Sequence, residues 1–346
     1  MHNYRCFKGV FKWIALQLIL LVSPFLIGQN IHFSQNYSAH LTLNPANTGR
    51  FNGDMRASSM YRSQGYQFSE AYNTFYLSFE KPFYVVNERI NTGLYFSHDN
   101  SYGNSLPANL IYFNVSHEVL LTLNNSLIVG LQMGYVHKMV SLAETTFPDQ
   151  YNREIGRFDP HLPTSEYFET TTSTHLDVGF GMLYSHSFIR GVWSMGISLQ
   201  RLNRPSESFF GIESQLPVRS VMHGKADINV GSSMFVMPSF IFVKQGEPTQ
   251  TIGGANIGYT LNNNSPKTLK NIILGMHYRN GLINDAHALI FSVGATYANV
   301  KFITSYDYDV SGLRTSNVRN ASFEFSLMYT LPSTNLKKKI VSCERY

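Results

Sequence analysis

The strongest constraint on this chain is a recurring stretch of about ten residues in which apolar side chains alternate with small or polar ones. In one stretch the apolar set is Leu176, Val178, Phe180, Met182 and Tyr184, and the intervening set includes Asp177, Gly179, Gly181 and Ser185. A period of two places such sets on opposite faces of a β-strand. We expect about fourteen strands, near residues 54–62, 73–83, 89–98, 109–122, 126–140, 175–186, 190–201, 217–231, 233–243, 249–260, 269–280, 286–298, 300–310 and 318–331.

The two faces differ in a way that favours a membrane barrel over a soluble sandwich. Charged residues make up 14% of the chain, against roughly 25% in soluble domains, and the polar faces are mostly Gly, Ser, Thr and Asn. Tyrosines stand at the ends of many runs, where a girdle at the lipid headgroups would place them: Tyr184, Tyr259, Tyr278, Tyr297 and Tyr329. The sequence therefore predicts an all-β fold, a single transmembrane antiparallel β-barrel of about 14 strands over residues 53–332. The even strand number puts both ends of the chain on one side.

The first 28 residues have the order of a secretory signal peptide. The positive residues Arg5, Lys8 and Lys12 precede an apolar run at residues 13–27, and we expect cleavage near Gly28. Cleavage would lower the net charge from +5 to +2 (5 − 3), so the basic composition gives no reason to expect a nucleic-acid partner. We therefore expect residues 1–28 to be a signal peptide and the chain to be exported to the cell outer membrane.

Connections between the expected strands are of two kinds. Leu123 to Asn125 and Arg279 to Gly281 have the Asn/Gly chemistry of tight turns. Residues 141–174 and 203–216 are longer, and in a barrel we expect long loops on the extracellular side. After the last strand comes a basic tail, residues 333–346, which contains Cys343; since Cys6 lies in the expected signal peptide, no internal disulfide is predicted.

Evidence for catalysis, a cofactor or a metal is weak. His175 with Asp177, and His32 with His40, lack the third ligand that a metal site needs, and we expect the first pair to line a polar lumen. The chain has no Gly-x-Ser-x-Gly turn and no phosphate-binding loop. Acidic residues in the first long loop are explained by solvation: Asp149, Glu154, Asp159, Glu166 and Glu169. We expect no catalytic residue, no metal and no cofactor, and hence a protein that is not an enzyme.

The segment after the signal peptide, QNIHFSQNYSAHLTLNPANTG at residues 29–49, is not strand-like. Together with the first strand and the C-terminal runs SYDYDVSGLR and ASFEFSLMY, it resembles the PorP/SprF family. These are membrane proteins of the type IX secretion system and of gliding motility in Bacteroidetes. The matching positions near the N-terminus are Phe33, Ser34, Gln35, Tyr37, Leu43, Asn44, Pro45, Ala46, Gly49, Tyr61, Arg62 and Gln64. His40 stands where the family pattern has Pro.

The resemblance implies a non-enzymatic outer-membrane barrel that assists export or surface attachment of large substrates. Its implied partners are outer-membrane lipid, type IX translocon components, the C-terminal domain of a large secreted adhesin-like substrate, and a periplasmic peptidoglycan-linked lipoprotein. Residues 29–52, with Tyr61 and Arg62, would form a plug or a partner-docking segment. An extended periplasmic leader explains residues 29–52 equally well. A solute channel and an outer-membrane hydrolase remain open as alternatives.

Overall fold

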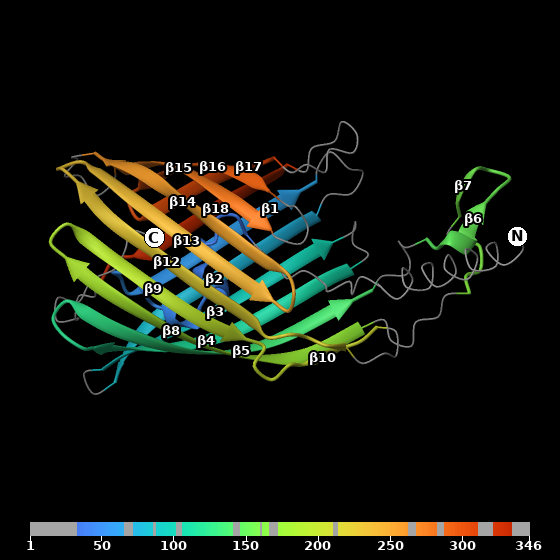
Figure 1. Cartoon of the computed structure of the whole chain (residues 1–346), viewed down its shortest axis with the longest axis horizontal. Helices are drawn as coiled ribbons and strands as arrows, with labels where there is room; N and C mark the ends of the chain where they lie inside the picture. The colour runs from blue at the N-terminus through green and yellow to red at the C-terminus, as the bar shows by residue number, and fades with distance from the viewer. Residues whose placement is uncertain are drawn as a thin grey trace, which may run out of the picture. The chain divides into compact units, whose positions relative to one another are not determined.

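The chain forms a closed antiparallel β-barrel of fourteen strands in a computed structural model (Figure 1). The structure describes residues 33–65, 72–85, 88–101, 106–140, 146–159, 161–165, 172–209, 214–261, 268–281, 287–310 and 321–333. The barrel strands are β1 (Met55–Gln64), β2 (Tyr72–Val85), β3 (Glu88–Ser101), β4 (Leu106–Leu120), β5 (Asn125–Met139), β8 (Thr172–Phe188), β9 (Gly191–Gln200), β12 (Arg219–Val230), β13 (Met234–Gln245), β14 (Thr249–Thr260), β15 (Leu269–Gly281), β16 (Ala288–Tyr297), β17 (Val300–Asp309) and β18 (Ser322–Leu331). Strands that follow one another in this order pair, and β1 closes the ring on β18.

The fold predicted from the alternation is confirmed, and each predicted strand coincides with an observed one to within a few residues. One local prediction is wrong. The stretch 279–281 is no turn but the last part of β15, where Arg279 pairs with Ala288 of β16. Arg279 faces the lumen and is buried, so the Asn-Gly pair beside it ends a strand.

The two ends of the barrel differ in their connections. At one end, called here the turn end, residues 121–124, 189–190, 231–233 and 298–299 join neighbouring strands. β1 begins and β18 finishes at this end, with Met55 opposite Leu331. Both long connections, 140–171 and 201–218, lie at the opposite end, called here the loop end. This is the asymmetry of bacterial barrels, whose short turns are periplasmic and whose long loops are extracellular.

Short elements occur outside the barrel wall. The 3₁₀ helices η1 (His40–Thr42) and η2 (Pro45–Asn47) precede β1, and η4 (Pro148–Gln150) with the pair β6 (Tyr151–Asn152) and β7 (Arg157–Phe158) lies in the first long connection. The second contains the pair β10 (Ser206–Glu207) and β11 (Ser214–Gln215). No helix among the described residues is long and apolar enough to cross a membrane. The expected signal peptide and nearly all of the expected basic tail lie outside the described residues.

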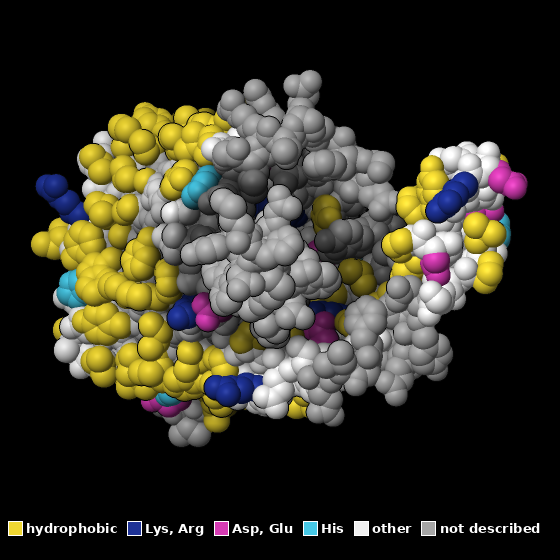
Figure 2. Space-filling view, turned by 45° about the vertical axis from the view of Figure 1, so that its right-hand side comes forward, with side chains coloured by type: hydrophobic (Ala, Val, Ile, Leu, Met, Phe, Trp, Pro, Cys, Tyr) yellow, Lys and Arg dark blue, Asp and Glu magenta, His cyan; other side chains and the backbone are white. Residues whose placement is uncertain are grey.

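The outer face of the barrel is apolar, as Figure 2 shows for one side of the molecule. Outward positions carry exposed Leu, Ile, Val, Met or Phe on every barrel strand except β1, whose exposed apolar side chain is Tyr61, and such a surface suits lipid and not water. Exposed tyrosines lie toward both ends: Tyr84, Tyr259, Tyr297 and Tyr329 near the turn end, and Tyr61, Tyr135, Tyr278 and Tyr306 near the loop end. They stand where aromatic side chains meet lipid headgroups.

Candidate functional site

The interior of the barrel holds the residues before β1, which we call the lumen segment, Phe33–Phe51. Nearly every residue of the segment is buried, and its hydrogen bonds reach strands around the ring, from β2 and β3 through β8 and β9 to β17 and β18. Figure 1 shows this part of the chain in blue within the ring of strands. Since the segment makes little regular structure, its buried peptide groups need partners from the wall.

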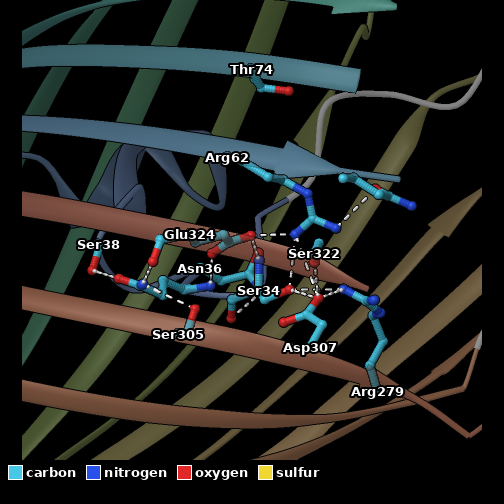
Figure 3. A network of polar contacts seen from close by, with 12 residues as sticks. Ser34, Asn36, Ser38, Arg62, Thr74, Arg279, Ser305, Asp307, Ser322 and Glu324 are labelled. Atoms are coloured by element: carbon cyan, nitrogen blue, oxygen red, sulfur yellow. Dashed lines mark hydrogen bonds and ion pairs between the residues drawn. The ribbon is translucent and has the colours of Figure 1, made fainter. Parts of the chain in front are cut away.

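Glu324 of β18 binds the start of the lumen segment (Figure 3). Its carboxylate accepts hydrogen bonds from the backbone amides of Ser34, at 2.6 Å, and Gln35, at 2.7 Å. Arg62 of β1 forms an ion pair with the same carboxylate and donates to the Ser34 hydroxyl at 2.9 Å. All four residues are buried. A charge in this position is stabilised only when it is paired and hydrogen-bonded, and the lumen segment supplies part of that pairing.

A second carboxylate, Asp307 of β17, extends this network. Arg279 of β15 lies 2.9 Å from Asp307 and donates to the Ser34 hydroxyl at 2.8 Å. The Ser34 hydroxyl in turn donates to Asp307 at 2.5 Å, and so does Ser322 at 2.7 Å. Figure 3 shows Ser34 between Arg62, Arg279 and Asp307. We call Arg62, Arg279, Asp307 and Glu324 the ionic anchor. Four strands thereby meet at one serine of the lumen segment.

Glu80 of β2 makes a similar contact nearer the turn end. Arg56 of β1 donates to its carboxylate at 2.7 and 3.0 Å, and the backbone amide of Gly49 donates at 2.8 Å. The His40 ring nitrogen Nε2 lies 2.9 Å from Glu80. Gly49 has a positive φ of 73°, and a Cβ there would lie 2.3 Å from Asn91. Only glycine fits this position.

On the side of β5, β8 and β9, glycines make room for the lumen segment. A Cβ at Gly130 would lie 2.4 Å from the backbone of Pro45 and Ala46, and one at Gly181 would lie 1.9 Å from the Asn44 side chain. We call Gly130, Gly181 and Gly196 the glycine cradle. Gly130 and Gly181 are directly paired across β5 and β8. Without side chains, the wall can be approached closely by another backbone.

Asn44 is the polar contact of the glycine cradle. Its Nδ2 donates to the carbonyls of Met182 and Ile197, at 3.0 and 3.1 Å, and its Oδ1 accepts from the Ala46 amide at 2.8 Å. The last bond makes Asn44 the N-cap of η2, and Pro45 at the first helical position is the residue favoured there. The Asn-Pro turn is therefore held both by its own geometry and by two strands of the wall.

Wall side chains also satisfy the carbonyls of the lumen segment. Ser198 donates to the Leu43 carbonyl at 2.6 Å and Gln200 to the Thr42 carbonyl at 2.9 Å. Farther along the ring, Ser116 of β4 donates to the Thr48 carbonyl at 2.8 Å and Arg89 of β3 to the Gly49 carbonyl at 2.7 Å. These inward Ser, Gln and Arg residues satisfy the buried carbonyls of the lumen segment, as backbone hydrogen bonds do within a helix or sheet.

Apolar packing completes the interior. Tyr37 and Leu43 form a buried cluster with inward residues of β12, β13, β14 and β16: Val221, Ile241, Ile252 and Ile290. Ala46 packs with Ile128 and Leu183, and the ring of Phe33 lies edge-on to Tyr76 with centroids 5.9 Å apart. The inward face is thus not uniformly small or polar, as the alternation suggested. It is apolar where the lumen segment presents an apolar side chain.

Most of the candidate residues chosen from the sequence come together in this site. Phe33, Ser34, Gln35, Tyr37, Leu43, Asn44, Pro45, Ala46 and Gly49 are buried in the lumen segment, and Arg62 reaches it from β1. Tyr61 does not take part. It lies on the outer face, 43% exposed, and its hydroxyl donates to Asn73 on the neighbouring strand.

Sequence reasoning missed the charged partners of the segment. Glu80, Asp307 and Glu324 are buried and inward-facing. Only Glu324 had a clear signal in the sequence, as the single charge of its strand, at an inward position among Phe323, Phe325 and Leu327. The strands of Glu80 and Asp307 carry other charges as well. Such a charge inside a membrane barrel calls for a partner, but alternation alone does not say that the partner comes from outside the strands.

The interior shows little that would serve catalysis. His175 Nε2 lies 3.4 Å from Asp177 in the lumen, and no group of three metal-ligating side chains occurs among the described residues. In the first long connection, Asp149 accepts hydrogen bonds from the Ser165 amide, at 2.6 Å, and from Thr164, at 3.0 Å. The Ser165 amide contributes most to lowering the pKa of this exposed carboxyl. These contacts order a loop and create no site.

Comparisons with known proteins identify the family. Residues 26–329 match the sequence profile described as type IX secretion system membrane protein PorP/SprF. The chain belongs to the PorP/SprF family. The resemblance read from residues 29–64 and from the C-terminal runs is therefore confirmed, and with it the localisation in the outer membrane. The PorP/SprF family is one of secretion-system membrane proteins, which implies association with other secretion components.

A solved barrel structure supports the fold of this PorP/SprF protein and nothing more specific. The CymD monoaromatic hydrocarbon channel superposes with a TM-score of 0.51 at 10% identity, over 89% of this chain and 96% of that one. A Pseudomonas aeruginosa FadL homologue gives 0.46 at 11% identity, over 83% and 92%. At such identities the likeness concerns the barrel alone. No curated protein sequence matches the chain.

Proposed function

We propose that this PorP/SprF protein is a non-enzymatic component of the type IX secretion and gliding machinery. It assists the export or surface attachment of large substrates that have a C-terminal secretion domain. It acts by binding. The lumen segment supports this proposal most strongly. The motif that resembles the family fills the interior of its own barrel. The surfaces left for binding partners are therefore the two ends of the barrel, and the interior is not an open pore.

The proposal assigns partners to the two ends of the barrel. The loop end, which carries both long connections, is extracellular and binds the substrate's C-terminal domain. The turn end is periplasmic and meets a peptidoglycan-linked lipoprotein. Support for this orientation comes from the lengths of the connections. The lumen segment then works as a plug, held by the ionic anchor and the glycine cradle.

Deletion of the gene in its host tests the proposal. Surface and culture-fluid proteins are compared by mass spectrometry between the wild type, the deletion strain and a strain complemented with the gene. We expect selective loss of one or a few large substrates with C-terminal secretion domains, restored by complementation. An unchanged surface proteome would contradict the proposal.

A solute channel is the second candidate, which the polar inner face would favour. Planar-bilayer recording distinguishes the two. We expect the purified barrel to give no steady conductance, because the lumen segment crosses the interior. A steady conductance in the wild type would favour a channel. The matched control is a variant with residues 33–49 replaced by a Gly/Ser linker, which should conduct if it folds, and heat-modifiable migration on electrophoresis checks that it has folded.

A further inference from the structure

The outer wall of the barrel has a groove on β14, β15 and β16 that the lumen site does not use. Its volume is about 520 Å³, within the range of small-molecule sites. It is lined on the outside by Gly253, Ala255, Ile257, Leu274, Met276 and Tyr278. Strand alternation places these side chains on the outer, membrane-facing side, where Ile257, Leu274 and Met276 are each more than half exposed.

The groove exists because β14 carries two small residues where its neighbours carry large ones. Gly253 lies between Phe240 of β13 and Tyr278 of β15, and Ala255 lies between Pro238 and Met276. An aromatic ring often covers a strand glycine, but here no atom lies within 4 Å of a Cβ built at Gly253. Phe240 covers a different glycine: a Cβ at Gly224 of β12 would lie 2.3 Å from its ring. The space above Gly253 is therefore open.

The dimensions of the groove fit one hydrocarbon chain. The β14 residues that line it, from Gly253 to Ile257, span about 13 Å at roughly 3.3 Å per residue, close to the ~15 Å of one leaflet's hydrocarbon. Leu274, Met276 and Tyr278 of β15 bound the groove on one side.

Polar groups mark the loop end of the groove. Tyr278 belongs to the tyrosines at that end, and its ring stacks on His287 with an interplanar angle of 3° and a Tyr278 Oη to His287 Nδ1 distance of 3.2 Å. Lys244 is exposed on the outer face of β13, four residues beyond Phe240 toward the loop end. This places a cation about 13 Å along β13 from Phe240, on the loop-end side of the groove.

We propose that this groove is a binding site for one acyl chain of an anionic outer-membrane lipid, with the chain seated over Gly253 and Ala255 and the headgroup phosphate beside Lys244. The groove faces the hydrocarbon of the bilayer, so the molecules that meet it first are lipids. In the groove a chain contacts the small residues of β14 and the larger side chains of β15 together, which enlarges the contact between that chain and the protein.

The test uses the whole folded barrel in vesicles that contain phosphatidylglycerol with a photoreactive group in the middle of one acyl chain. Crosslinked peptides are mapped by mass spectrometry. We expect crosslinks on residues 253–257 and 274–278 to exceed those elsewhere on the outer belt by about tenfold. Crosslinks spread evenly around the belt would overturn the proposal.

Variants sharpen the result. Gly253→Leu puts a side chain into the groove, where its Cβ meets nothing within 4 Å, and should lower crosslinking there about tenfold. Val178→Leu, at an outward position on β8, should leave the crosslinking unchanged. Lys244→Gln should remove the preference for phosphatidylglycerol over phosphatidylcholine and keep the position of the chain. Equal crosslinking in Gly253→Leu and the wild type would overturn the proposal. A barrel that is dimeric in the wild type and monomeric in Gly253→Leu would also overturn it. Heat-modifiable migration on electrophoresis shows that each variant has folded.

Discussion

The two sides of the lumen hold the same segment by different physical means. Around β1, β15, β17 and β18 the ionic anchor binds its first residues through charge and hydrogen bonds. Around β5, β8 and β9 the glycine cradle receives the Asn-Pro turn by shape, because the wall lacks side chains there. Binding on the first side depends on buried charges that must stay paired. Binding on the second side depends on the absence of wall side chains, which leaves room for the Asn-Pro turn. Their responses to mutation should therefore differ in size and in kind.

The largest effect is expected for Glu324→Ala. The substitution leaves Arg62 without its carboxylate and the amides of Ser34 and Gln35 without an acceptor, so the free energy of opening the lumen segment should fall by about 3–5 kcal/mol. Hydrogen exchange of peptides from residues 33–51, followed by mass spectrometry, measures that opening. Glu154→Gln, at an exposed loop position, is the control. If exchange in Glu324→Ala stays as slow as in the wild type, the ionic anchor does not hold the segment.

A smaller loss is expected for Gly130→Ala in the glycine cradle. The new methyl group would lie 2.4 Å from the backbone of Pro45 and Ala46, and overpacking of this kind costs about 1–3 kcal/mol. The matched control is Gly253→Ala on the outer face, where the added methyl group meets nothing. Equal urea stability and equal hydrogen exchange in the two variants would show that the wall yields and that shape is not what seats the turn.

The smallest effect is expected for Ser198→Ala, which removes one hydrogen bond to the Leu43 carbonyl. A single buried hydrogen bond of this kind contributes about 1 kcal/mol, and Gln200 Nε2, at 3.3 Å from the same carbonyl, can keep it satisfied. Hydrogen exchange should quicken for residues near Leu43 and remain unchanged near Ser34. A loss as large as that of Glu324→Ala would remove the distinction between the two sides.

Much of the wall could be predicted from the sequence. The alternation at 176–184, and its repetition along the chain, reports directly which side chains meet lipid, because each strand must keep an apolar outer face in the membrane. Arg279 shows where prediction from local sequence fails. The Asn-Gly pair next to it has turn chemistry, but pairing with β14 and β16 and contact with Asp307 keep it in a strand.

The position and contacts of the lumen segment could not be predicted from the sequence. Its motif could be recognised and its Asn-Pro turn expected, yet a plug, a docking segment and an extended leader have the same local sequence. Glu324 meets Ser34 across 290 residues of chain, and no local pattern encodes a contact of that separation. Inward Ile241 and Ile252 were likewise unexpected, since their reason is Tyr37 and Leu43 on another part of the chain.

The sequence by itself determined the barrel, its strand number, its lipid-facing surface and its family, because these follow from a period of two and from short motifs within single segments. Only the tertiary structure decided what fills the lumen, which charges pair, and where the outer wall is hollow. Each of these depends on how strands are brought together. Ring closure brings β1 to β18, and the pairing of β14 with β13 and β15 sets Gly253 between Phe240 and Tyr278. Such registers are fixed by packing and not by local propensity.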